Sequence, residues 1–433
     1  MADEKNWIRE AMFYHIYPLG FTGAPLRNEG EATAGGRILE VLDWIEHFKE
    51  LGINAIYFGP IFESVSHGYD TTDYYQTDSR LGSKEDFKKV FTALHENGIR
   101  VIVDGVFNHV GRKFFAFLDV QKNLEQSDYK DWFCNLNFSW QSPLGDSFSY
   151  ENWHGAAELV KLNLRNPAVC EHLLGAVGMW MDELGIDGLR LDAADCVDRE
   201  FFKRLHSFTK GKREDFWLMG EIIHGDYKMW ANPDMMHSGT NYECWKGIYS
   251  SHNDKNYFEI AYSLKRQFGQ GGLYENLCLY NFLDNHDVNR IGSLLKQREN
   301  LKNAYTLLYM MPGIPSIYYG SEWGIEGVKG QGMDADLPLR PKLDLEEMCA
   351  QETDLPAHIR ELAKIRKESD AVKYGAYDEV LVRNKQFVFA RRSGEQYKVI
   401  ALNLTDHAET LHFSYQGKEY EVLLEAYTSK IME

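Results

Sequence analysis

Apolar residues recur along the chain in a repeating order of helical stretch, glycine and short β-branched run. This order occurs in ELGINAIYF (50–58), ENGIRVIVD (96–104) and ELGIDGLRLD (183–192). The glycines Gly52, Gly98 and Gly185 stand where a helix C-terminus favours a left-handed residue. The runs that follow are short and apolar, as parallel strands covered on both faces are. The pattern predicts a series of βα repeats.

The helix within the second repeat is predicted to begin at Ser83, where Asp86 can complete a capping box. Its expected buried face comprises Phe87, Phe91 and Leu94, and that of the preceding helix comprises Leu42, Ile45 and Phe48. Further strands are predicted at 12–17, 217–221, 279–283 and 315–319, with a less direct one near 240–245. Eight strands alternating with helices favour a closed barrel over an open sheet.

Two departures from the repeat predict additional domains. The interval from Gly98 to Gly185 is nearly twice that from Gly52 to Gly98, so an extra, aromatic-rich segment follows the third strand. After the helical stretch 356–369 the pattern changes to alternating strands such as QFVFARR and YKVIALNL. We therefore predict an α/β fold: a (β/α)₈ TIM barrel at 1–110 and 162–369, an inserted subdomain at 111–161, and a C-terminal antiparallel, sandwich-like β domain at 370–433.

The charge balance and the cysteines exclude several classes of protein. Lys and Arg number 47 against 65 Asp and Glu, and the resulting net charge of −18 repels phosphate backbones and anionic membranes. No segment reaches the roughly 18–20 apolar residues of a membrane span, and MADEKNWIRE lacks the pattern of a secretory leader. The six cysteines show no C-x-x-C spacing, which is typical of reduced thiols. We expect a cytoplasmic protein that binds neither nucleic acid nor membranes.

Polar residues end four of the predicted strands. They lie in RVIVDGVFNH (Asp104, Asn108, His109), GLRLDAAD (Arg190, Asp192), FWLMGEIIH (Glu221) and YNFLDNHD (Asp284 to Asp287). In a barrel such positions meet at one mouth, where active sites lie. Each residue alone has a structural explanation, such as a helix cap or an ion pair. The four endings together favour a catalytic site with at least three carboxylates.

Arg190 and Asp192 are two residues apart on a strand, so their side chains point the same way. A guanidinium there holds the carboxylate ionised and oriented, as a nucleophile requires. Glu221 follows an apolar strand and has no neighbouring cation in the sequence, so burial and other carboxylates could keep it protonated as an acid. Two carboxylates with opposite protonation states are typical of glycoside hydrolysis, and retaining enzymes hold them about 5–5.5 Å apart.

The strand endings resemble the short motifs of the α-amylase family of glycoside hydrolases. The matching segments are DGVFNH (104–109), GLRLDAAD (188–195), GEIIH (220–224) and FLDNHD (282–287). In addition, HGYDTTDYY (67–75) is similar to the family's loop after the second strand, and VKLN (160–163) to the motif that closes its inserted domain. The resemblance spans nearly the whole chain and implies a retaining enzyme that acts on an α-glucoside oligosaccharide.

The resemblance also implies the catalytic roles. Asp192 would attack C1 of the sugar, and Glu221 would protonate the leaving oxygen. Asp287 would bind the sugar hydroxyls more strongly as the ring distorts. Arg190 would orient the nucleophile.

The substrate contacts follow by the same correspondence. Tyr69 would stack on the sugar at the cleavage site, although a core aromatic is the alternative at that position. Asp104, His109 and His286 would fix the same sugar through hydrogen bonds.

The sequence departs from the family where many secreted amylases hold a structural calcium ion. Those enzymes draw on an Asp in the motif matched by VKLN and a His shortly after the nucleophile, and Lys161 and Cys196 stand there in this chain. A lysine ammonium could replace the divalent cation between barrel and insertion, through Asn108 and backbone carbonyls. No metal or other cofactor is therefore expected. Lysine at 161 also resembles neopullulanase and cyclomaltodextrinase relatives, and a merely solvent-exposed Lys161 is the alternative.

Several functions stay open at this point. Hydrolysis of α-1,4 bonds in maltooligosaccharides or short α-glucans leads, but an α-glucanotransferase or a sucrose- or trehalose-directed enzyme would share the same sugar subsite. A non-catalytic scaffold is disfavoured because all three carboxylates are present. No long β module precedes the first predicted strand near residue 12, so dimerisation through such a module is not expected, and the oligomeric state stays open.

Overall fold

The computed structural model describes residues 7–30, 36–332 and 334–433, which form two compact units. Unit 1 comprises Met1–His15, Glu46–Ala55 and Thr240–Glu433, and unit 2 comprises Ile16–Ile45 and Ile56–Gly239. Residues 1–6, 31–35 and 333 of the predicted barrel segments lie outside the described residues. All six cysteines are free thiols.

The main sheet has eight parallel strands in the order β11-β10-β9-β5-β2-β1-β13-β12. Their bounds are β1 Phe13–Ile16, β2 Ala55–Phe58, β5 Arg100–Gly105, β9 Gly188–Leu191, β10 Trp217–Gly220, β11 Ser238–Gly239, β12 Tyr280–Phe282 and β13 Ile314–Tyr318. An isolated parallel bridge between Thr240, directly after β11, and Tyr280 in β12 brings the sheet close to closure. The predicted (β/α)₈ barrel is confirmed.

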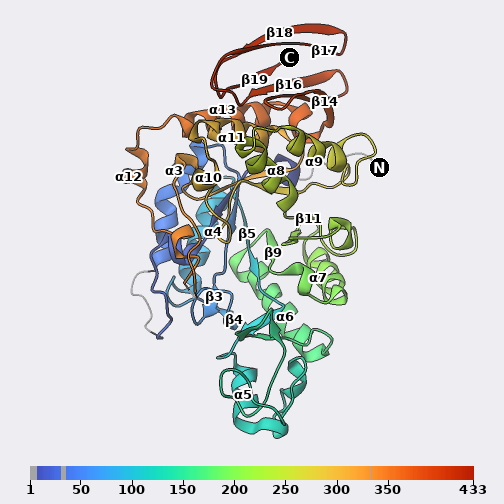
Figure 1. The fold of residues 1–433 in the computed structure, drawn as a ribbon. Coiled ribbons are helices and arrows are strands. Elements are labelled where there is room, and N and C mark those ends of the chain that lie inside the picture. The colour runs from blue at the N-terminus through green and yellow to red at the C-terminus, as the bar shows by residue number, and fades with distance from the viewer. Residues whose placement is uncertain (1–6, 31–35, 333) are drawn as a thin grey trace. The chain divides into compact units, whose positions relative to one another are not determined.

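The helices follow the strands along the chain, as the repeat predicts (Figure 1). They are α1 Trp7–Glu10, α2 Pro18–Phe21, α3 Ile45–Glu50, α4 Lys84–Glu96, α5 Phe115–Asn123, α6 Pro167–Met179, α7 Arg199–Lys212, α8 Tyr242–Asn253, α9 Phe258–Phe268, α10 Ile291–Leu294, α11 Leu301–Met310, α12 Leu345–Cys349, α13 Leu355–Glu368 and α14 Asp370–Tyr374. Gly52, Gly98 and Gly185 have φ angles of 77°, 72° and 73°, which confirms the left-handed stops.

The predicted start of α4 is confirmed in detail. The Ser83 side chain accepts from the Asp86 N–H, and the Asp86 carboxylate accepts from the Ser83 N–H, so the capping box is complete. Phe87, Phe91 and Leu94 are buried along the inner face of the helix.

Two expectations about elements need correction. The preceding helix buries Ile45 and Phe48, as predicted, but it opens as a 3₁₀ turn over Arg37–Trp44, which buries Val41 and Trp44 and leaves Leu42 half-buried. The strand expected near 240–245 is β11 at Ser238–Gly239 instead, and α8 begins at Tyr242. The Asn241 side chain accepts from the Cys244 N–H, which caps α8 and ends the extended segment.

The segment between β5 and α6 in unit 2 holds small elements of its own. Strands β6 (His109–Gly111), β8 (Ala156–Lys161) and β7 (Asn152–Trp153) form a sheet in that order, preceded in the chain by the hairpin of β3 (Phe62–Ser64) and β4 (Thr71–Thr77). Phe117 meets the rings of Phe133, Phe148 and Tyr150 at centroid distances of 5.1–5.7 Å. These aromatic contacts supply a local core.

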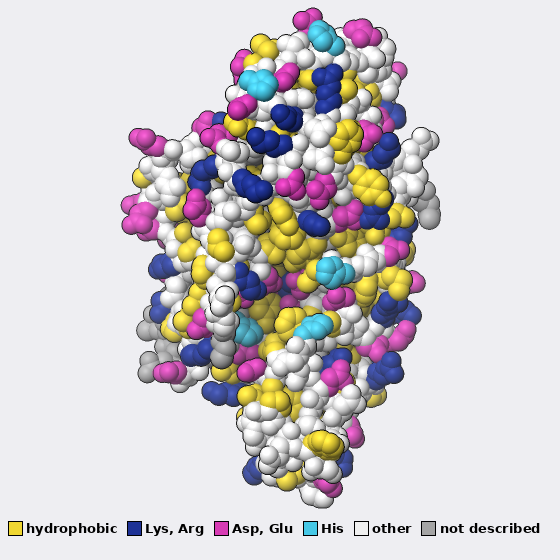
Figure 2. Space-filling model, viewed as in Figure 1, with side chains coloured by type: hydrophobic (Ala, Val, Ile, Leu, Met, Phe, Trp, Pro, Cys, Tyr) yellow, Lys and Arg dark blue, Asp and Glu magenta, His cyan; other side chains and the backbone are white. Residues whose placement is uncertain are grey.

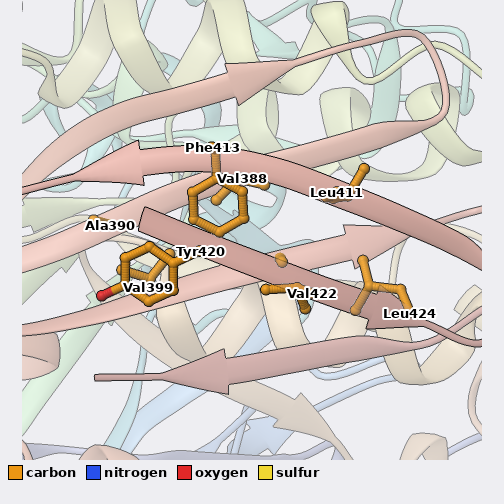
Figure 3. Close-up of a cluster of buried hydrophobic side chains, with 9 residues drawn as sticks. Val388, Ala390, Val399, Leu411, Phe413, Tyr420, Val422 and Leu424 are labelled. Carbon is orange, nitrogen blue, oxygen red and sulfur yellow. The ribbon is translucent and has the colours of Figure 1, made fainter. Parts of the chain in front are cut away.

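The C-terminal segment of unit 1 forms antiparallel sheets, as predicted. β14 (Ala376–Val382), β15 (Gln386–Ser393), β16 (Gln396–Asn403) and β19 (Ser429–Met432) form one sheet, and β17 (Glu409–Tyr415) and β18 (Lys418–Leu424) form a hairpin. Alternate residues of these strands pack together between sheet and hairpin, among them Val388, Val399, Leu411 and Val422 (Figure 3).

Candidate active site

The carboxyl ends of three neighbouring strands in unit 2 bring the predicted acidic residues together. Asp104 of β5 pairs in register with Arg190 of β9, and Leu191 of β9 pairs with Gly220 of β10. Asp192 and Glu221 are the residues directly after those two strands. Because the strands are parallel and in this register, Asp104, Asp192 and Glu221 share one edge of the sheet.

The Arg190 side chain joins these three carboxylates. Its Nη1 lies 2.7 Å from Asp104 Oδ1 and 2.8 Å from Asp192 Oδ1, and its Nη2 lies 2.8 Å from Glu221 Oε2. Arg190 is 3% exposed. Burial alone would lower the pKa of the guanidinium, but the charges of Asp104 and Glu221 raise it well above its usual value. Arg190 is therefore a permanent cation at this edge.

The surroundings of Glu221 differ from the expectation. No basic residue neighbours Glu221 in the sequence, but Arg190 contacts it in the fold. The expectation that Glu221 has no cation beside it is therefore wrong. The Ala193 N–H also donates to Glu221 Oε2 at 3.0 Å. Ala193 has a φ angle of 43°, an uncommon conformation for a residue with a Cβ.

Two tyrosines hold the far oxygen of Asp104. The hydroxyls of Tyr57 and Tyr69 donate to Asp104 Oδ2 at 2.7 Å and 3.1 Å. The Tyr69 ring is 9% exposed, and the Arg190 guanidinium carbon lies 5.9 Å from its centroid. The structure thus brings Tyr69 to Asp104 and Arg190. Sequence reasoning missed Tyr57, because it is one of several aromatic residues in an apolar strand.

His109 lies beside the predicted nucleophile. Its Nε2 is 4.0 Å from Asp192 Oδ2 and has no hydrogen-bond partner among the described residues, and its Nδ1 is 3.1 Å from Asn108 Nδ2. Burial, with a smaller effect from the charge of His67, lowers the pKa of His109 to about 3. The ring is therefore neutral near pH 7, and Nε2 is left to bind another polar group.

The fourth strand ending lies in unit 1, after β12. His286 Nε2 is 3.0 Å from Asp287 Oδ2, and Asp287 has 36% of its side chain exposed. Asp284 has a different role from its neighbours, since it accepts from the Ile291 N–H and the Ser321 hydroxyl. Burial raises the pKa of Asp284. Its hydrogen bond to the Ile291 N–H anchors the start of α10.

Arg340 is a site residue that sequence reasoning missed. Its Nη2 contacts Asp287 Oδ1 at 3.0 Å and Asp336 Oδ2 at 3.1 Å, and its Nε donates to the His286 carbonyl at 3.0 Å. Arg340 is 53 residues from Asp287 in the chain, in the irregular segment LPLRPKLD, where no periodic pattern marks it. The Arg340 guanidinium thus holds the carboxylate of Asp287, the residue that the sequence placed at the end of this strand.

The family model for the catalytic domain of α-amylase matches residues 15–361. The chain belongs to the α-amylase family.

Similar proteins agree with this assignment. A cyclomaltodextrinase from a Bacillus species is 31% identical over 428 residues, which cover 94% of this chain and 74% of that protein. An intracellular maltogenic amylase from Bacillus subtilis is 31% identical over 386 residues, or 85% of this chain and 63% of that one. A solved cyclic α-maltosyl-(1→6)-maltose hydrolase from Arthrobacter globiformis has a TM-score of 0.85 at 26% identity, with 99% and 98% of the two chains covered. This α-amylase family member is a glycoside hydrolase that acts on α-glucans.

The residues at the family's calcium position make contacts within unit 2. Lys161 Nζ lies 2.6 Å from Glu151 Oε1, and this hydrogen bond raises the pKa of Lys161. The expected contact with Asn108 is wrong, because Asn108 Oδ1 is buried with no hydrogen-bond partner in the described chain. Cys196 Sγ lies 3.5 Å from His154 Nε2. Over residues 7–30, 36–332 and 334–433, no group of three or more His, Cys, Asp or Glu is placed to hold a metal ion.

The same described ranges contain no helix that is both long and apolar enough to cross a membrane.

Proposed function

We propose that this enzyme hydrolyses α-1,4-glucosidic bonds of maltooligosaccharides with retention of the anomeric configuration. The observation that carries the proposal is a single guanidinium with Asp192 and Glu221 on its two terminal nitrogens, each at 2.8 Å. Because those nitrogens belong to one small planar group, the arrangement suits carboxylates about 5–5.5 Å apart better than the roughly 6.5–9.5 Å of inverting enzymes.

The chemistry then takes two steps. Asp192 attacks C1 of the sugar, and the bond from C1 to the leaving oxygen breaks as Glu221 gives that oxygen its proton. A water molecule next attacks C1 of the glycosyl ester, Glu221 takes its proton, and Asp192 leaves as a carboxylate. Arg190 supports both steps because its fixed charge stabilises Asp192 as the attacking and as the departing group.

The remaining residues would bind the sugar at the cleavage site. The unpartnered Nε2 of neutral His109, 4.0 Å from Asp192 Oδ2, can donate to a sugar hydroxyl next to the reacting carbon. Tyr69 would stack on the ring, Asp104 would accept from a hydroxyl, and His286 with Asp287 would bind further hydroxyls as the ring distorts. Asp287 is the third catalytic carboxylate in this scheme.

The substrate range is proposed from the relatives' names. These name cyclomaltodextrin, the formation of maltose by an amylase, and a cyclic maltosyl-maltose, so short α-glucans form the main class. The α-1,6 link in the name of the Arthrobacter globiformis hydrolase favours testing branched substrates as well. The intracellular Bacillus subtilis relative supports a cytoplasmic location.

The direct test is anomer-resolved NMR of the products from maltoheptaose. The native enzyme is expected to release α-anomeric short dextrins, and Asp192→Asn to lose at least about 10³-fold in kcat because the nucleophile is gone.

Asp198→Asn is the matched control. Asp198 caps α7 by accepting from the Glu200 N–H, and asparagine caps equally well, so its activity is expected to be unchanged. Initial products of β configuration would reject retention. Absence of turnover on maltoheptaose, cyclodextrin, sucrose and trehalose would reject the hydrolase.

Removal of divalent cations tests the expected absence of the family's calcium. Lys161 places an ammonium where those enzymes bind a cation, and its partner Glu151 is in the same segment. We expect activity and Tm to be the same, within error, after dialysis against a chelator and after adding back Ca²⁺. A fall in Tm of several degrees that Ca²⁺ reverses would show that a calcium site exists.

A further inference from the structure

A cavity of about 450 Å³ lies between helices α8 and α9 of unit 1, outside the site described above. Its lining residues come from both helices and the turn that joins them: Glu243, Lys246, Gly247, Asn256, Phe258, Glu259, Tyr262 and Ser263. The two helices lie side by side (Figure 1). A Cβ at Gly247 would come within 3.1 Å of Ile260 Cδ1, so this glycine lets the helices approach closely.

Two aromatic rings of this cavity face solvent. Phe258 is 50% exposed and Tyr262 is 67% exposed. They stand four residues apart on α9, which puts both rings on the same face of the helix. Aromatic residues that pack in a protein core bury most of their surface. Packing in the core therefore does not account for the positions of Phe258 and Tyr262. Both rings line the cavity with much of their surface exposed, so a ligand in the cavity could stack on them.

The polar residues around the rings suit a neutral, hydroxyl-rich ligand. Glu243 and Glu259 supply carboxylate acceptors, Lys246 an ammonium donor, and Asn256 an amide with both functions. Arg266 Nε lies 3.3 Å from Glu243 Oε1, which fixes that carboxylate at the rim. Charges of both signs lie together here, as they do across the face shown in Figure 2. With a net charge of −18 on the whole chain, an anionic ligand is disfavoured.

We propose that this cavity is a second α-glucan binding site, which holds a maltooligosaccharide segment by stacking on Phe258 and Tyr262. The apolar faces of glucose rings would lie on the aromatic rings, and their hydroxyls would reach the polar rim. The volume lies within the roughly 300–1,000 Å³ range of small-ligand sites. The proposal rests on the proposed function for its ligand class. A second site on the same chain would retain long glucans and leave short ones unaffected.

The test compares Phe258→Ala/Tyr262→Ala with native enzyme in native gels that contain soluble amylopectin. We expect the native enzyme to be retarded and the double variant to bind at least about fivefold more weakly, since each stacked ring contributes part of the affinity. The variant's kcat/KM on amylopectin is expected to fall by a similar factor, and that on maltotriose to stay within twofold. Tyr262→Phe keeps the ring and is expected to bind nearly as the native enzyme does. Leu423→Ala, which removes another exposed apolar side chain, is the matched control.

Equal retardation of the native enzyme and the double variant would overturn the proposal. So would a change in elution volume on size exclusion for the double variant, because the rings would then form a contact between subunits. Gel retardation needs no turnover, so it is read separately from the proposed hydrolysis. A native enzyme that is retarded but inactive on every α-glucan would reject the proposed function and retain the second site.

Discussion

Arg190 is a buried cation that contacts three carboxylates, Asp104, Asp192 and Glu221, at 2.7–2.8 Å. Three buried acids at one sheet edge would repel one another and would each lose hydration. The planar guanidinium offsets both costs because it has enough donors to reach all three. The same contacts orient the carboxylates, so one residue stabilises the site and sets its geometry.

Arg190→Lys is therefore expected to be far from conservative. Lysine ends in a single nitrogen on a shorter side chain, whereas Arg190 contacts Asp104 and Asp192 through Nη1 and Glu221 through Nη2, so at least one carboxylate loses its partner. We expect kcat on maltoheptaose to fall by about 100-fold, on the order of 3 kcal/mol of transition-state stabilisation, with a smaller change in KM. Steady-state kinetics at a temperature where the variant is folded measure this.

Arg80→Lys provides the matched comparison. Arg80 is also buried and makes a two-point contact with Asp78, at 2.9 Å and 2.7 Å, and its Nη1 donates to the Ser66 carbonyl at 2.6 Å. Neither partner is one of the proposed catalytic residues. Its replacement is expected to lower Tm and to leave kcat within about twofold. If both variants lost kcat equally, the loss in Arg190→Lys would be a general effect of removing a buried guanidinium.

At the residue scale, the spacing of residues in the sequence predicted the contacts between side chains of one strand. It missed the contacts between side chains of different strands and loops. The contact of Arg190 with Asp192 follows from two residues on one strand face. The contact of Arg190 with Glu221 requires the register of two strands, and the contact of Arg340 with Asp287 requires the path of an irregular loop. Neither register nor loop path is encoded in a periodic pattern.

Among the elements, β9, which Asp192 directly follows, lies between β5 and β10 at very close range. A Cβ at Gly188, the first residue of β9, would lie 2.4 Å from the Trp217 carbonyl oxygen and 3.0 Å from Ile102 Cγ2. Gly188 also pairs in register with Ile102 on one side and Trp217 on the other. The backbone cannot shift away from one neighbour without pressing on the other.

Gly188→Ala is expected to destabilise the protein by about 2–4 kcal/mol, because a methyl group must displace a paired backbone carbonyl. Gly211→Ala is the control with the same chemical change. Gly211 lies in α7, where an added methyl group would have no atom of another element within 4 Å, and this variant is expected to gain about 0.5–1 kcal/mol from the better helix former. Urea denaturation followed by circular dichroism measures both. Equal stabilities for the two variants would contradict the close packing.

Elements with strong local signals could be predicted, and those without could not. Gly98 and Gly185 marked helix ends, and Ser83 with Asp86 marked a helix start, because each requires a particular residue type. β11 was misplaced because it is only two residues long, Ser238–Gly239, and neither residue is apolar enough to signal a strand. A barrel of this kind needs eight strands, so the existence of β11 could be predicted. Its position in the sequence could not.

Across the whole molecule, buried neutral histidines couple stability to pH. Burial lowers the pKa of His109 to about 3 and of His237 and His252 to about 4. The first two lie in unit 2 and the third in unit 1, so both units share this property. His252 Nδ1 donates to the Ile248 carbonyl at 2.7 Å, and its Nε2 lies 3.2 Å from the Tyr257 hydroxyl. The hydrogen bond to the Ile248 carbonyl raises the pKa of His252, so burial is what keeps the ring neutral.

The enzyme is therefore expected to lose stability on acidification between about pH 6.5 and pH 4. In that window the unfolded chain, with histidine pKa values near 6.5, binds more protons than the folded one, so the free energy of unfolding rises with pH. The contribution is fully present above about pH 6.5 and is lost as the pH falls toward the folded pKa values. Most carboxylates titrate lower, near pH 4, which isolates the histidines.

His252→Gln should lower Tm at pH 7.5, because contacts are lost, yet show a smaller further fall between pH 6.5 and 4.5. The exposed His412→Gln should fall in parallel with the native enzyme. Parallel curves for all three proteins would place the acid sensitivity elsewhere than at His252.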